Sequence, residues 1–97
     1  MPKHIADALQ ASSLEGLLEA RELNHLRVRR HGDLLVLESG PTDDPLAHAR
    51  LRRMGAHIWC LEMPSHKSWE TTPFRGQIQE LLTLLEADFP WTLTPRD

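Results

Sequence analysis

The sequence has a single cysteine, no tyrosine and no long apolar run. Cys60 has no partner for an internal disulfide, which argues against a secreted disulfide scaffold and favours a reducing, cytoplasmic compartment. No apolar run approaches the ~18 residues of a membrane-spanning helix. The first ten residues also lack the basic and apolar regions of a signal peptide. We therefore expect a cytoplasmic protein that does not cross a membrane.

The composition is that of an ordinary globular domain, with 40% hydrophobic and 26% charged residues in a chain of 97. This length fits one domain, residues 1–97. The formal net charge of −3 argues mildly against nucleic acid as the main partner. The charges are uneven, however, because residues 21–53 contain seven arginines: Arg21, Arg27, Arg29, Arg30, Arg50, Arg52 and Arg53. The first half of the predicted sheet should be locally basic.

Helical periodicity occurs at both ends of the chain. Residues 3–23 are predicted to be helical, either as one helix or as two that break at Ser12-Ser13, with a capping box from Ser12 to Glu15 and an end at Asn24. Residues 74–89 are predicted to form the second helical region, after Pro73 in its first turn and before Pro90. In the tail, residues 90–97, Trp91 and Leu93 are expected to pack against the sheet edge.

Between the helices, residues 25–72 alternate with a period of two and are interrupted by turn residues. The predicted turns are His31-Gly32, the loop 40–47, and three-residue turns at 54–56 and 64–66. These turns divide the segment into an antiparallel β-meander of about five strands. The predicted fold class is α+β, with the N-terminal and C-terminal helices packed on one face of the sheet.

The turns also predict a register. Val28 is expected opposite Leu35, Leu51 opposite Trp59, and Leu61 opposite Trp69. Both of these tryptophans would then lie on the face that the helices cover. Arginines would line the other face, and Arg50 would be the cross-strand neighbour of Cys60.

One order of motifs runs from residue 25 to residue 92. It consists of a basic hairpin ending GDLLVLE, a proline-containing loop, ARLRR, W-C-L, a second tryptophan before a proline, and an apolar helix. In this order the chain resembles small bacterial proteins that are grouped as domains of unknown function. The recurring letters are mainly structural: Gly32, Glu38, Arg50, Trp59, Leu61 and Trp69. The resemblance implies a fold, but no activity, cofactor or ligand.

Three chemical interpretations have simpler alternatives. His57 and Cys60 are three apart and would point to opposite faces of a strand, so no metal site is predicted. Cys60 is more readily a buried apolar residue than a nucleophile. Glu62 and Glu70, expected on one face, form ion pairs with arginines more readily than an acid/base pair. We therefore expect no enzyme and no cofactor.

The uncovered face offers the strongest functional prediction. Leu34, Val36 and Ile58 would lie there with Cys60, surrounded by charges of both signs, which is typical of a protein interface. We expect a small interaction or accessory module that forms a homodimer through Leu34, Val36, Ile58, Arg27, Arg29, Arg50, Glu38, Glu62 and Glu70. Coverage of this face by the first helix would instead give a monomer. A further alternative is a nucleic-acid-binding module that uses Arg27, Arg29, Arg50 and Arg52.

Overall fold

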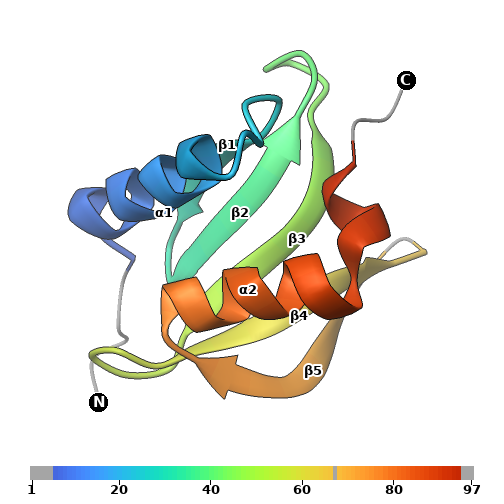
Figure 1. Ribbon diagram of the computed structural model, residues 1–97. Helices are drawn as coiled ribbons and strands as arrows, with labels where there is room; N and C mark the ends of the chain where they lie inside the picture. The colour runs from blue at the N-terminus through green and yellow to red at the C-terminus, as the bar shows by residue number, and fades with distance from the viewer. Residues whose placement is uncertain (1–5, 67, 95–97) are drawn as a thin grey trace.

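The fold is one antiparallel sheet of five strands with two helices against one face. A computed structural model of the chain describes residues 6–66 and 68–94. Its elements are α1 (Ala8–Ala20), β1 (Arg27–His31), β2 (Leu34–Ser39), β3 (Leu46–Arg53), β4 (Trp59–Ser65), β5 (Ser68–Gly76), α2 (Ile78–Asp88) and the 3-10 helix η1 (Pro90–Leu93). The strands follow one another in the sheet, and Figure 1 shows α1 and α2 in front of the same face. The predicted α+β meander is confirmed. We call the face under the helices the inner face and the opposite one the outer face.

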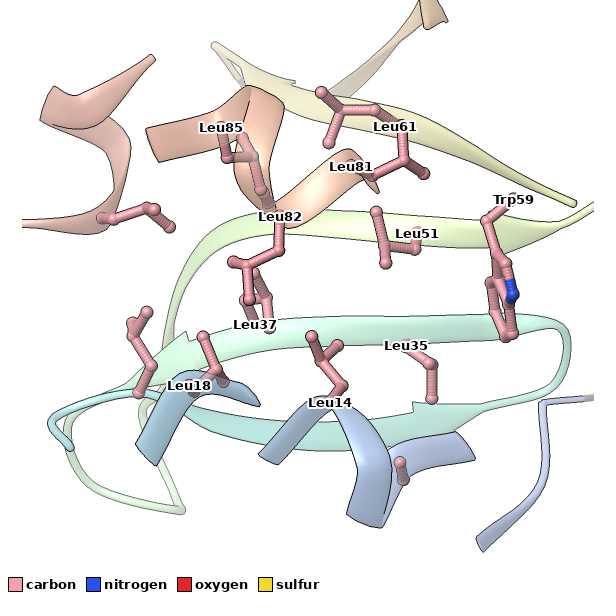
Figure 2. Close-up of a cluster of buried hydrophobic side chains, with 14 of the residues drawn as sticks. Leu14, Leu18, Leu35, Leu37, Leu51, Trp59, Leu61, Leu81, Leu82 and Leu85 are labelled. Carbon is pink, nitrogen blue, oxygen red and sulfur yellow. The ribbon is translucent and has the colours of Figure 1, made fainter. Parts of the chain in front are cut away.

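The core fills the space between the helices and the inner face, as Figure 2 shows. The helices contribute five leucines to it: Leu14 and Leu18 of α1 and Leu81, Leu82 and Leu85 of α2. The sheet contributes alternate residues, because successive side chains of a strand point to opposite faces. These are Leu35, Leu37, Leu51, Trp59 and Leu61, each at most 2% exposed.

The first hairpin has the predicted faces but a different register. Its turn consists of Gly32 and Asp33, so His31 pairs with Leu34 and Val28 pairs with Leu37. Gly32 has φ of +60°, a left-handed conformation that glycine adopts without a Cβ penalty. The predicted pairing of Val28 with Leu35 was wrong by two residues. A shift by two leaves each side chain on its face, so the division into inner and outer residues survives.

The pairing of β3 with β4 is also displaced by two residues. Leu51 pairs with Leu61 and not with Trp59, which pairs with Arg53. The predicted neighbour of Cys60 was wrong as well, because Arg52 lies opposite it. The inner face again keeps the predicted residues. The cause is a longer connection, residues 54–58, than the predicted three-residue turn.

The last hairpin differs from the prediction by an odd number of residues, which turns side chains over. The strand β4 continues through Pro64 to Ser65, and Pro64 pairs with Trp69. Because Pro64 lies two residues from Glu62, on the same face, Trp69 is on the outer face and not in the core, where we predicted it. Glu70 pairs with Met63, so it lies on the inner face.

Both helices begin later than predicted. The first is a single helix that continues through Ser12 and Ser13, and its capping box joins Asp7 and Gln10 instead of Ser12 and Glu15. Residues 3–5 of the predicted helical segment lie outside the described residues. The left-handed residue after α1 is Glu22, with φ of +61°, and not Asn24.

The segment around Pro73 is strand where we expected helix. Pro73 and Phe74 belong to β5, and α2 begins only at Ile78, where Gln77 and Glu80 form its capping box. Proline is tolerated there because β5 is an edge strand. Of the tail residues expected to pack, Leu93 is buried but Trp91 is 61% exposed.

Candidate binding face

The outer face is open in the part of the chain that the structure describes, since both helices lie on the inner face (Figure 1). One row of residues crosses all five strands in register. Arg29 pairs with Val36, Val36 with Arg50, Arg50 with Glu62, and Glu62 with Thr71. The outer face is therefore a polar surface built around a few side chains from each strand.

Glu38 anchors the arginines of β1. It is 4% exposed, although no helix covers it. The Nε atom of Arg27 donates to its Oε1 and the Nε atom of Arg29 to its Oε2, at 3.3 and 3.0 Å. The remaining nitrogens of Arg27 donate to the carbonyl oxygens of Gly40 and Pro41. Arginine stems thus cover a carboxylate that would otherwise be in water.

Glu62 anchors the arginines of β3 in the same way. It is 3% exposed, and the Nε atoms of Arg50 and Arg52 donate to its two oxygens at 2.6 and 3.0 Å. Thr71 adds a hydrogen bond from β5, and Arg52 also reaches Asp33. Burial by itself would raise the pKa of Glu62, but the hydrogen bonds from Arg52, Arg50 and Thr71 outweigh it and lower that pKa. Glu62 is therefore a permanent anion at neutral pH.

Arginine side chains line this face, and those of Arg27, Arg29 and Arg52 are 33–49% exposed. The carboxylates of Glu38 and Glu62 lie beneath them, and each of the four arginines is held through its Nε atom. Arg50 also stacks on Trp69, with its central carbon 4.3 Å from the ring centroid. Ion pairs and stacking together fix the direction of these side chains.

The charge of the molecule is divided between its two faces. Among the described residues, the outer face carries five arginines and three acids, an excess of two positive charges: Arg27, Arg29, Arg50, Arg52, Arg75, Asp33, Glu38 and Glu62. The helical layer is acidic, with exposed Glu15, Glu19, Glu80, Glu86 and Asp88. The formal net charge of −3 thus hides a basic face.

The predicted interface is only partly assembled. Leu34 and Val36 lie on the outer face, but they are only 7% and 3% exposed. Ile58 is 52% exposed in the β3–β4 connection and is not part of a strand. Glu70 lies on the inner face, so it forms no pair with Glu62. The alternative in which the first helix covers the outer face was wrong, because α1 packs on the inner face.

A buried histidine site was not visible in the sequence. His48 is fully buried, and its Nδ1 lies 2.6 Å from the carbonyl oxygen of Thr92 while its Nε2 lies 2.7 Å from the hydroxyl of Ser39. Since a carbonyl only accepts, Nδ1 carries the proton and donates to it. A register shift brings His48 here, because Leu37 faces Ala49 while the next residue, Glu38, already faces Ala47. No sequence signal marked the bulge.

The Ser39–His48 pair has a structural role, since it links β2 and β3 to η1. Both side chains are buried among the described residues. His25 makes a similar contact, because its Nε2 lies 2.7 Å from the carbonyl oxygen of Leu93. The two histidines therefore hold η1 against the sheet.

A cavity of about 610 Å³ lies between the first turns of α1 and α2 and the β3–β4 connection. Asp7 and Glu80 already cap the two helix ends there through their side chains. Arg53, at the rim, donates to the carbonyl oxygens of Gly55 and Ala56. Asp7 and Arg53, two charged residues of its lining, are thus hydrogen-bonded within the chain.

Within residues 6–66 and 68–94, no three His, Cys, Asp or Glu side chains gather as metal ligands. Cys60 is buried, with its sulfur directed to the carbonyl oxygens of Leu61 and Thr72. No helix among the described residues is long and apolar enough to span a membrane.

Comparison with known proteins adds no family. No protein-family model matches the chain, and no curated protein or solved structure matches it. The arguments about function therefore rest on the geometry of the outer face.

Proposed function

We propose that this chain is a small, non-catalytic interaction module whose outer face docks on an acidic surface of a partner protein. One observation carries the proposal: arginines on an open sheet face are held in place through Nε by buried glutamates. Prior ordering reduces the entropy lost when a partner binds. Arginine and tryptophan, both present on the outer face, are also among the residues that most often dominate binding energy at protein interfaces.

Self-association through this face is a weaker candidate. The apolar residues that would form the centre of a dimer, Leu34 and Val36, are already covered within one chain. Two copies placed face to face would also bring their positive excesses together. An acidic partner meets neither obstacle.

Nucleic acid is also less favoured. A nucleic acid presents a continuous row of phosphates, and only two positive charges remain on this face after its internal ion pairs. The acidic helical layer would repel the rest of a long polyanion. Trp69 is the one aromatic side chain of the described outer face, whereas single-strand binders stack several bases.

A photo-crosslinking comparison tests the proposal. A crosslinking amino acid replaces His31, on the outer face of β1, or in the control replaces exposed Ser12 on α1. The expected product is a protein captured only from position 31, and less of it when Arg29→Glu is added. Arg30→Glu is the matched control, because Arg30 neighbours Arg29 but pairs with inner-face Leu35.

The captured protein is then identified, purified and tested for direct binding. It should bind the wild type and lose affinity for Arg29→Glu but not for Arg30→Glu. Capture of RNA or of a second copy of this chain, or equal capture from positions 31 and 12, would overturn the proposal.

A further inference from the structure

Two arginines of the outer face differ from the others in the hydrogen bonds of their guanidinium groups. Arg27 and Arg52 use their terminal nitrogens within the chain, on backbone carbonyls and on Asp33 with Glu62. For Arg29 and Arg50, the described residues provide hydrogen bonds to Nε only. The Arg29 side chain is 49% exposed and the Arg50 side chain 17%.

These two arginines lie in one row. Both pair with Val36, Arg29 from β1 and Arg50 from β3, so two strand spacings of about 4.8 Å separate their backbones by about 10 Å. Val36 forms an apolar floor between them, 3% exposed. Separate glutamates anchor the two Nε atoms, and Trp69 supports the plane of the Arg50 guanidinium.

We infer that Arg29 and Arg50 form a two-armed clamp for two carboxylates of an acidic protein segment; this inference rests on the proposed function. A guanidinium whose Nε is engaged still offers its two terminal nitrogens to an oxygen anion, and arginine is suited to such carboxylate recognition. The two arms start from backbone positions about 10 Å apart, and the proposed clamp takes two carboxylates at about that spacing.

That spacing selects the conformation of the segment. In a helix, acidic residues seven positions apart lie on the same face and are about 10.5 Å apart along the axis. In an extended segment, residues about 10 Å apart are three positions apart and point to opposite sides. The clamp therefore fits an acidic helix that lies across the strands, from β1 to β3.

Alanine-rich helical peptides provide the probe. One carries two glutamates seven positions apart, a second carries them five positions apart on different faces, and a third carries two glutamines. Titration of the isotope-labelled protein, followed by NMR at low salt, should show binding of the first peptide, with shifts of the Arg29 and Arg50 side-chain signals. The second and third peptides should bind at least about fivefold more weakly, since one or both charge-assisted contacts are lost.

Three variants locate the effect. Arg29→Lys and Arg50→Lys keep the charge but lose the planar guanidinium, and each should weaken binding of the first peptide severalfold. Arg30→Lys is the matched control and should leave the affinity unchanged, because Arg30 neighbours Arg29 but pairs with inner-face Leu35. Native-like NMR spectra of the variants show that the fold is retained.

Equal affinity for the three peptides, or an equal effect of Arg30→Lys, would overturn the clamp. Tighter binding of a thymidine oligonucleotide than of the first peptide at the same salt concentration would assign the site to nucleic acid instead. The proposed function stands apart from this result: a partner captured from position 31 and lost with Arg29→Glu supports the interaction module even if no acidic helix binds.

Discussion

Replacement of Glu62 by glutamine tests whether the buried carboxylate holds the outer face together. The variant keeps the shape of the side chain but removes the charge that Arg50 and Arg52 share. Removing one partner of a fully buried ion pair costs about 3–5 kcal/mol. Here the arginines are 17% and 34% exposed and can regain water, so we expect a loss of about 2–3 kcal/mol in the free energy of unfolding.

Chemical denaturation at pH 7, with thermal unfolding as a second measurement, gives this value. For a domain of this size, a loss of 2–3 kcal/mol lowers Tm by about 10–20 °C. Glu70→Gln is the control, because Glu70 is exposed and opposite Met63 on the inner face; it should change stability by less than about 0.5 kcal/mol. A Glu62→Gln variant as stable as this control would show that the arginine cluster contributes nothing to the fold.

The pH dependence supplies an independent check. The pKa of Glu62 is lower in the folded chain than in the unfolded chain, where a glutamate titrates near about 4.3. Its contribution is therefore complete above that value and is lost as the pH falls through the lower pKa of the folded state. The stability difference between the wild type and Glu62→Gln should shrink as the pH falls from about 4.5. A difference that stays constant down to pH 2.5 would contradict the assigned shift.

The remaining predictions concern other parts of the fold. Trp59→Ala should cost about 3–5 kcal/mol in a denaturant titration, whereas Trp69→Ala, which removes a half-exposed ring, should cost about 1 kcal/mol; equal costs would contradict the assigned faces. His48→Ala should cost about 2–4 kcal/mol, because it leaves a cavity and removes two buried hydrogen bonds, and rapid amide exchange should appear in η1; unchanged exchange there would refute the anchoring role. Gly32→Ala should cost about 1 kcal/mol in thermal unfolding, since alanine must adopt φ of +60°, and an unchanged Tm would argue against this turn.

The periodicity of the sequence was enough to define the fold class and most of the core. Alternation with a period of two assigned Leu35, Leu37, Leu51 and Leu61 to one face, and the helical spacing from Ile78 to Leu85 predicted the face of α2. These assignments survived register errors in two hairpins, because both errors were of two residues. Parity along a strand is a local property, and so the sequence itself determines it.

The tertiary structure decided what depends on exact turn length. A register difference of three residues in the last hairpin moved Trp69 to the outer face and Glu70 to the inner face, which changed the composition of the candidate site. The bulge that buries His48 likewise arises from pairing between strands and from the position of η1. Neither follows from a pattern of neighbouring residues.

The tertiary structure also determined which side chains of the outer face are exposed. The sequence placed Val36 beside arginines and glutamates, but it did not show that Glu38 and Glu62 would lie beneath the arginines, each held by two Nε atoms. A strand pattern predicts which side a residue faces, and the reach of long side chains from neighbouring strands decides what covers it. For that reason the sequence predicted an exposed apolar interface, where the folded chain presents a surface of ordered guanidinium groups.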